Sequence, residues 1–304
     1  MSSNRPRVRE VGLQIGEFPP GKYNAITDVD SVKVGHATII RGKGKLKIGE
    51  GPIRTGVTAI IPHPANVLEE PVEASYFVFN GAGTTTGLSL IDEFGLIETP
   101  ILLTNTLSVG AVYDACVQYV VKRSFNDREV RWFNPVVGET YDGYLNDAGG
   151  LHVKAEHVFE ALDSAKGGYF EEGNVGAGTG TGALGFKAGI GTSSRTATIG
   201  DSVFTVGVLV QSNFGGSLTI KGVPVGKELR KEKTKREGGG SIMVIVATDV
   251  PLSYRQLNRI LKRGTLGLTR TGWNASHGSG DYFIGFSTSF RKEDWSSDIQ
   301  TARK

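Results

Sequence analysis

The sequence predicts a layered α/β protein, and three observations support this fold class. Short segments rich in Val, Ile and Phe recur along the chain, bounded by Gly, Pro, Asn or Asp, which is typical of β-strands. Several, such as 242–246, are apolar at consecutive positions, so both faces of these strands are expected to be covered. Amphipathic helical segments lie between them. The 304 residues, 38% of them apolar, suffice for one large domain or two small ones.

The expected strands span residues 57–62, 75–80, 100–104, 203–211, 242–248 and 282–287. Apolar residues at helical spacing predict helices over 107–121 and 153–165. A third helix follows Pro251, where Ser253 and Gln256 form a capping box. Gly264 is expected to end that helix.

Composition narrows the class of protein. Glycine occurs 43 times, about twice its usual share, which indicates tight turns and close backbone contacts. A formal charge of +3 gives no argument for a nucleic-acid partner. The N-terminus has no apolar signal region, and no apolar run approaches the length of a membrane span, so we expect a cytoplasmic protein without a membrane partner. The single cysteine, Cys116, is expected to be a small core residue.

A polar segment precedes the most apolar strand. Residues 227–240, KELRKEKTKREGGG, are almost without apolar side chains and predict an exposed, mobile loop. Ser241 follows this loop at the start of the strand, where its hydroxyl could attack the preceding carbonyl of Gly240. Glycine tolerates the distorted backbone that such an attack needs. Local sequence alone leaves an ordinary turn before a strand as the alternative.

Cleavage at Gly240–Ser241 would give Ser241 both a hydroxyl nucleophile and a free α-amino group. Such an amine titrates near pH 7.7–8.0, so a substantial fraction is neutral at neutral pH. It can then serve as the general base that accepts the hydroxyl proton, through a water or a neighbouring hydroxyl. This is the self-activated type of nucleophile that includes N-terminal threonine.

Nine segments along the chain form a recognisable series of motifs. They are 23–29 (YNAITDV), 32–36 (VKVGH), 135–143 (PVVGETYDG), 145–147 (LND), 173–180 (GNVGAGTG), 211–215 (QSNFG), 240–252 (GSIMVIVATDVPL), 267–272 (GLTRTG) and 279–281 (SGD). In this order they resemble the L-aminopeptidase/D-esterase and β-peptidyl aminopeptidase family, whose members cleave themselves to expose an N-terminal serine. The segments cover most of residues 10–290, and their collinear order is more specific than any one motif.

The resemblance implies a role for each matching site residue. Ser241 is implied to be the nucleophile, released by cleavage after Gly240. Ser279 and Asp281 are implied to form a hydroxyl and carboxylate relay around its amine, although the family often has Glu at the position of Asp281. A hydroxyl can pass a proton and a carboxylate can hold the resulting ammonium.

The remaining implied roles concern the substrate. Asn213 is implied to donate its amide to the developing oxyanion, with an Asx-turn to Gly215 as the alternative. Glu139 is implied to bind the substrate ammonium and Tyr141 to contribute a hydroxyl in the same pocket. Without the resemblance, these two residues read as a surface Glu and a half-buried strand Tyr.

The resemblance further implies an αββα sandwich of two central sheets between helical layers, forming a single self-processing domain. Cleavage would give subunits 1–240 and 241–304. No metal or organic cofactor is implied, and a homo-oligomer, tetrameric in the family, is expected. Family chains continue beyond the Ser279 region with terminal helices, whereas this sequence has a polar tail after residue 290, so we expect either a truncated chain or a missing last helical layer.

The implied activity is release of N-terminal amino acids from small peptides, amides or esters that carry a free amine. Preference among L-α, D-α and β-amino acids stays open. One alternative is an uncleaved, inactive relative with a binding or structural role. Another is a related self-processing acyltransferase, although those enzymes use threonine where this chain has Ser241.

Two further patterns give weak signals. The run 180–185, GTGALG, matches the dinucleotide fingerprint but lacks the strand and helix that the fingerprint requires on either side. Close backbone packing near the active site explains its glycines better. The five histidines form no metal-binding pattern, with His152 and His157 five residues apart.

Overall fold

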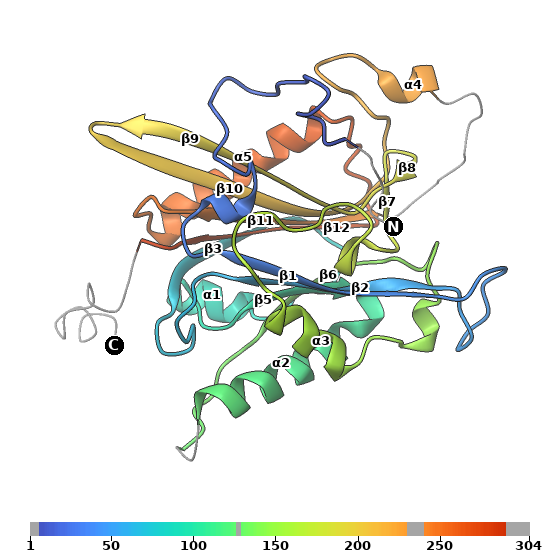
Figure 1. Cartoon of the computed structure of the whole chain (residues 1–304), viewed down its shortest axis with the longest axis horizontal. Helices are drawn as coiled ribbons and strands as arrows, with labels where there is room; N and C mark the ends of the chain where they lie inside the picture. The colour runs from blue at the N-terminus through green and yellow to red at the C-terminus, as the bar shows by residue number, and fades with distance from the viewer. Residues whose placement is uncertain (1–5, 126–128, 230–239, 290–304) are drawn as a thin grey trace.

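Two β-sheets stacked face to face form the centre of the molecule, with helices on both outer sides (Figure 1). The computed structural model describes residues 6–125, 129–229 and 240–289. The strands are β1 (Lys33–Arg41), β2 (Ile53–Ile61), β3 (Val72–Gly81), β4 (Leu96–Ile97), β5 (Ile101–Asn105), β6 (Val136–Thr140), β7 (Gly182–Ala183), β8 (Phe186–Lys187), β9 (Ile190–Ile199), β10 (Ser202–Asn213), β11 (Gly240–Thr248) and β12 (Ser279–Ser287). The α-helices are α1 (Leu88–Phe94), α2 (Val109–Ser124), α3 (Ala155–Asp163), α4 (Val225–Leu229) and α5 (Tyr254–Thr269).

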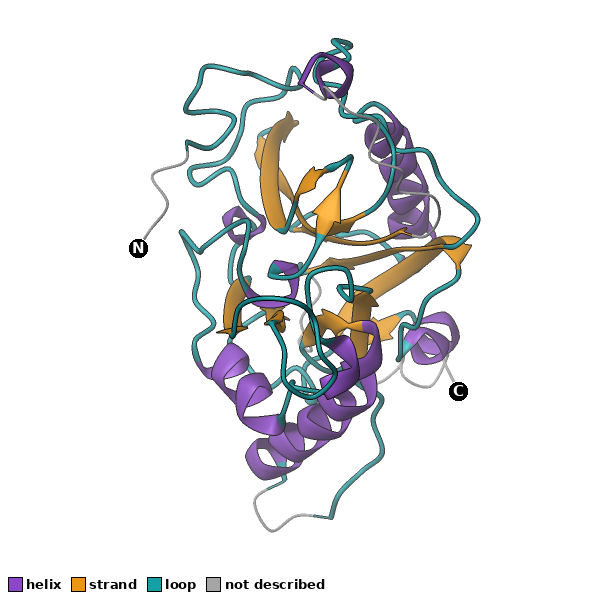
Figure 2. Ribbon diagram, turned by 90° about the vertical axis from the view of Figure 1, so that its right-hand side faces the viewer, coloured by secondary structure: helices purple, strands orange, loops and turns teal. Residues whose placement is uncertain are grey.

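One sheet has four strands in the order β1-β2-β5-β6, and the other has six in the order β4-β3-β12-β11-β10-β9. Helices α2 and α3 cover the outer face of the four-stranded sheet, and α5 packs on β3 and β12 of the six-stranded sheet (Figure 2). The predicted αββα sandwich is therefore confirmed. Residues 290–304, on which the expectation of a missing last helical layer depends, lie outside the described residues.

The core follows these layers. One buried cluster fills the space between the sheets and includes Leu103, Met243 and Ile284. A second lies under α2 and α3 and contains Cys116, whose predicted place in the core is confirmed. Gly138 of β6 brings the sheets close together, since a Cβ there would lie 2.3 Å from the Met243 methyl carbon. This contact places the end of β6 beside the start of β11.

The six predicted strands correspond to β2, β3, β5, β10, β11 and β12, and the three predicted helices to α2, α3 and α5. The prediction that Gly264 ends the last helix is wrong, because α5 continues to Thr269. Gly264 instead allows close packing, since a Cβ there would lie 2.8 Å from the Phe283 ring. The predicted capping box is present, with Ser253 N donating to Gln256 Oε1 at 3.0 Å.

Several elements escaped sequence reasoning. Strand β9 is rich in Ser and Thr, β6 has five residues, and β1 and α1 lacked a strong periodic signal. The predicted mobile loop 227–240 is corrected at its two ends, where residues 227–229 belong to α4 and Gly240 begins β11. Its residues 230–239 lie outside the described residues.

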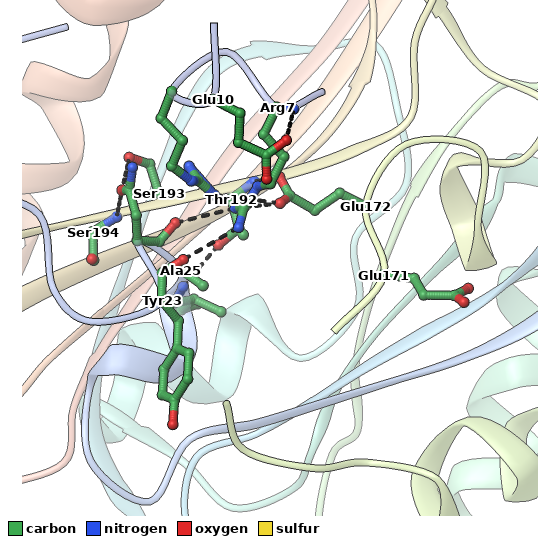
Figure 3. A network of polar contacts seen from close by, with 12 residues as sticks. Arg7, Glu10, Tyr23, Ala25, Glu171, Glu172, Thr192, Ser193 and Ser194 are labelled. Atoms are coloured by element: carbon green, nitrogen blue, oxygen red, sulfur yellow. Dashed lines mark hydrogen bonds and ion pairs between the residues drawn. The ribbon is translucent and has the colours of Figure 1, made fainter. Parts of the chain in front are cut away.

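The N-terminal segment covers the edge of the six-stranded sheet. Thr196 N of β9 donates to the Pro19 carbonyl at 2.8 Å, so backbone groups of this edge strand have a partner. The Arg7 guanidinium forms an ion pair with Glu172, which also accepts from Thr192 N at 3.1 Å (Figure 3). Arg7 donates as well to the Tyr23 carbonyl at 3.3 Å. These contacts fix the N-terminal segment to β9 and to the loop that leads to β7.

Candidate active site

A cleft of about 660 Å³ opens where β6, β10 and β11 come together. Its lining residues are supplied by both sheets and by the loops that follow them, and small or polar residues predominate. They are Ala82, Gly83, Thr106, Glu139, Tyr141, Gly143, Tyr144, Gly182, Asn213, Phe214, Gly215, Gly240, Ser241, Asn274, Ser276 and Gly278.

Ser241 is the second residue of β11 and is 5% exposed. Its register partner on β10 is Asn213, and side chains of directly paired residues lie on one face of a sheet. Side chains alternate along a strand, so Ser241 shares its face with Met243, which packs between the sheets. Strand β11 continues through the Gly240–Ser241 bond. The predicted nucleophile therefore lies in the cleft, beside the predicted oxyanion donor.

Ser279 and Asp281 lie on the neighbouring parallel strand β12, paired with Gly240 and Ile242. They flank the backbone of Ser241 on the opposite face from its side chain. Ser279 Oγ donates to Asp281 Oδ1 at 2.5 Å, so the shorter Asp side chain still reaches the hydroxyl. Asn80 Nδ2 donates to the other carboxylate oxygen at 2.9 Å. Burial raises the Asp281 pKa, and these two hydrogen bonds oppose that rise.

Asn213 is held at both ends of its side-chain amide. Its Oδ1 accepts from Gly182 N at 3.1 Å, and its Nδ2 donates to the Tyr141 carbonyl at 2.7 Å. An amide nitrogen carries two hydrogens, so this geometry orients the second one. The Asn213 side chain therefore hydrogen-bonds Gly182 N and the Tyr141 carbonyl, and not Gly215 as the alternative Asx-turn would require.

Glu139 comes from β6 of the four-stranded sheet and is 2% exposed, which corrects its alternative reading as a surface residue. Oε1 accepts from Thr84 N at 2.8 Å, and Oε2 accepts a short hydrogen bond from the Thr106 hydroxyl. Burial raises the Glu139 pKa, whereas the hydrogen bonds from Thr106 and Thr84 lower it. Such a carboxylate, at the bottom of a cleft, can bind a cation that replaces its lost solvation.

Tyr141 follows β6 at the mouth of the cleft, and 55% of its side chain is exposed. Its ring packs over Gly143, where a Cβ would lie 2.4 Å from the hydroxyl oxygen. All six predicted site side chains, Ser241, Ser279, Asp281, Asn213, Glu139 and Tyr141, are thus brought to or next to one cleft.

Sequence reasoning missed Asn80, Thr84 and Thr106. Asn80 reaches Asp281 through the β3–β12 pairing, in which the two residues are register partners. Thr106 reaches Glu139 because β5 and β6 are parallel, so the residues after β5 lie beside the end of β6. The only sequence signal was their position at or just after the end of a predicted strand, in TNT (104–106) and NGAGTTTG (80–87). Their contacts with Asp281 and Glu139 could be found only from the order of the strands in the two sheets.

The glycine run 180–185 has a structural role in the site. It contributes the short strand β7, from which Gly182 N donates to Asn213 Oδ1. Strand β8 follows the run, where a dinucleotide site would need a helix. Within residues 6–125, 129–229 and 240–289, no group of three or more His, Cys, Asp and Glu is arranged to hold a metal ion. Over the same residues, no helix has the length and apolar character needed to cross a membrane.

This αββα sandwich, with a serine at the start of a central strand and an amide opposite it, defines the chain as a hydrolase of the N-terminal-nucleophile fold class. Residues 24–303 match peptidase family S58. The chain belongs to this peptidase family and is an aminopeptidase-type hydrolase.

Similar proteins agree with this assignment. The β-peptidyl aminopeptidase BapA of Sphingosinicella microcystinivorans is 44% identical, over 94% of this chain and 76% of that protein. The PH0078 protein of Pyrococcus horikoshii OT3 superposes with a TM-score of 0.89 at 51% identity, over 96% of this chain and 82% of that one. The L-aminopeptidase D-Ala-esterase/amidase of Ochrobactrum anthropi, described as a variant of the Ntn hydrolase fold, has a TM-score of 0.88 at 41% identity, with the same coverage.

Proposed function

We propose that the chain cleaves itself between Gly240 and Ser241, and that Ser241 then releases N-terminal amino acids from small peptides, amides or esters. The observation that carries this proposal is the register of β11. It aligns Ser241 with Asn213 on one side and places the Ser279–Asp281 pair against the Ser241 backbone on the other. A hydroxyl, an amide donor and a hydroxyl–carboxylate pair thus converge on one residue.

Self-cleavage begins when Ser241 Oγ attacks the Gly240 carbonyl carbon. The C–N bond breaks as the C–O bond forms, so the acyl group moves to the side-chain oxygen and the nitrogen becomes a free amine. Water then hydrolyses this ester, which leaves a carboxylate on Gly240 and restores the Ser241 hydroxyl. The products are subunits 1–240 and 241–304. They stay associated because β11 and β12 of the second subunit pair with β10 and β3 of the first.

Substrate hydrolysis uses the same groups. The Ser241 amine, with an ordinary pKa near 7.7–8.0, takes the hydroxyl proton through a water. Ser279 and Asp281, which lie against the Ser241 backbone, stabilise the ammonium that results. Asn213 donates to the oxyanion of the tetrahedral intermediate, with the Tyr141 hydroxyl as a second donor. Such donors contribute roughly 10²–10³ in rate. Water then hydrolyses the acyl-enzyme.

Glu139 is proposed to bind the free amine of the substrate. A blocked amine would leave this buried carboxylate without a cationic partner, which favours substrates with a free N-terminus. Substrates of this kind agree with the names of the similar proteins, a β-peptidyl aminopeptidase and an L-aminopeptidase D-Ala-esterase/amidase. A homo-oligomer, as the resemblance implies, and a cytoplasmic location complete the proposal. Light scattering measures the oligomeric state.

The test is mass spectrometry and N-terminal sequencing of the purified chain and of its Ser241→Ala variant. We expect a fragment that begins Ser-Ile-Met-Val in the wild type and an intact 304-residue chain in the variant. Ser212→Ala is the matched control, because Ser212 lies on β10 next to Asn213, with its side chain on the opposite face. An intact wild type with aminopeptidase activity would refute the mechanism. An intact, inactive wild type would favour a binding role, and acyl transfer to hydroxylamine in preference to water would favour an acyltransferase.

A further inference from the structure

A chain of buried hydrogen bonds lies beneath the cleft, within the four-stranded sheet. Asn105, the last residue of β5, donates from Nδ2 to Thr55 Oγ1 of β2 at 2.8 Å. Both side chains are at most 3% exposed, so this hydrogen bond forms without competition from solvent.

The same chain reaches Glu139 through Thr106. Asn105 Oδ1 accepts from Leu107 N at 3.1 Å and thereby caps the 3-10 turn Thr106–Ser108. Thr106 is the first residue of that turn, and its hydroxyl donates to Glu139 Oε2. The Asn105 side chain therefore links two groups: its oxygen caps the turn that contains Thr106, and its nitrogen is held by the Thr55 hydroxyl.

We propose that Asn105 and Thr55 form a positioning relay that holds the Thr106 hydroxyl on Glu139 and so sets the affinity for the substrate amine. This inference rests on the proposed function, in which Glu139 binds that amine. Neither relay residue lines the cleft, so each is a positioning residue.

The relay acts on binding of the amine because of where it lies. It belongs to the four-stranded sheet, whereas Ser241, Asn213, Ser279 and Asp281 belong to the six-stranded sheet. A displaced Thr106 would leave the buried Glu139 carboxylate with one donor fewer, which raises the Glu139 pKa further above its ordinary value. Asp142 and Tyr282 are the titratable groups whose own pKa values respond to the Glu139 charge, so both belong in the interpretation of a pH profile.

The test is Thr55→Val, which removes the linking hydroxyl at nearly constant volume. Thr58→Val is the matched control, because Thr58 is a fully buried threonine of the same strand whose hydroxyl bonds His36 and Ala177 N, away from the relay. We expect Thr55→Val to raise KM for an amino acid amide roughly three- to tenfold, as loss of one hydrogen bond would. The kcat should stay within about twofold, and Ki for propylamine as a competitive inhibitor should rise by the same factor as KM.

Two further variants keep the test independent of folding defects. Thr106→Val should raise KM at least as much as Thr55→Val, because the relay acts through that hydroxyl, and Thr106→Ser should restore it. The acid limb of the kcat/KM profile should move to higher pH in Thr55→Val and Thr106→Val. Cleavage at Ser241 should remain complete in all of these variants.

Equal KM values for Thr55→Val and Thr58→Val, or a fall in kcat at constant KM, would overturn the relay while leaving the proposed function intact. An unshifted acid limb in Thr106→Val would overturn it as well. A wild type without Ser241-dependent hydrolysis would overturn the proposed function, and the relay with it.

Discussion

Replacement of Glu139 by Gln tests whether Glu139 recognises the substrate amine independently of the chemistry proposed for Ser241. Glutamine has almost the same shape and keeps an oxygen for Thr84 N and a nitrogen for the Thr106 hydroxyl oxygen, so the local fold should survive. The negative charge is lost at a side chain that is 2% exposed. A hydrogen bond to a charged group is worth about 1.5–3 kcal/mol, and each 1.36 kcal/mol is tenfold, so kcat/KM should fall by roughly 10- to 150-fold.

The assay is hydrolysis of an amino acid p-nitroanilide, compared with its N-acetylated form. Acetylation of the substrate should lower kcat/KM strongly in the wild type and much less in Glu139→Gln, because the variant has no carboxylate charge to pair with the amine. Cleavage at Ser241 should proceed in the variant, because it needs no substrate ammonium. Wild-type kcat/KM in Glu139→Gln, or an equal penalty for acetylation in both proteins, would refute the assignment of Glu139 as the amine site.

The same substitution makes a prediction about stability against pH. Burial raises the Glu139 pKa in the folded protein above its unfolded value, so the contribution of Glu139 to stability is greatest at low pH and is lost as pH rises through the folded pKa. Glu139→Gln should therefore melt at a higher temperature than the wild type at pH 7, and the difference should shrink below about pH 4, near the unfolded pKa of Glu. Thermal unfolding followed by circular dichroism at the two pH values measures this, and an identical difference at both would contradict it.

Three further outcomes are expected. Gly264→Ala should destabilise the protein by about 1–3 kcal/mol, because the added Cβ would meet Phe283. Gly267→Ala, which has open space around it in the same helix, should stabilise the protein by about 0.5–1 kcal/mol. Denaturant midpoints of the two variants measure this difference. Asn213→Ala should lower kcat by roughly 10²–10³ with little change in KM, and a large change in KM alone would point to a binding role. Cys116 should resist iodoacetamide in the native protein and react after unfolding, because burial raises its thiol pKa to about 12; rapid native labelling, seen by mass spectrometry, would contradict this.

Local physical chemistry in the sequence was sufficient for the elements with strong patterns. The apolar runs of β10, β11 and β12 and the capped start of α5 were predictable because periodicity and capping act within a few residues. The site residues were a different matter, since Ser241, Asn213 and Glu139 read locally as a turn, a strand end and a surface position. Collinear motifs, which follow the order of the whole chain, singled them out.

Long-range packing determined which residues contact the site residues, because such contacts depend on the order of the strands and not on local sequence. Strand order made Asn80 a partner of Asp281 and Thr106 a partner of Glu139, although these residues are far apart in sequence. Stacking of the two sheets through Gly138 and Met243 brought Glu139 into the same cleft as Ser241. Gly264, expected to end a helix, instead packs against Phe283. Burial and hydrogen-bond partners are properties of residues that meet only after folding, so the sequence determined the strongly patterned elements and singled out the predicted nucleophile, while the tertiary structure decided what surrounds it.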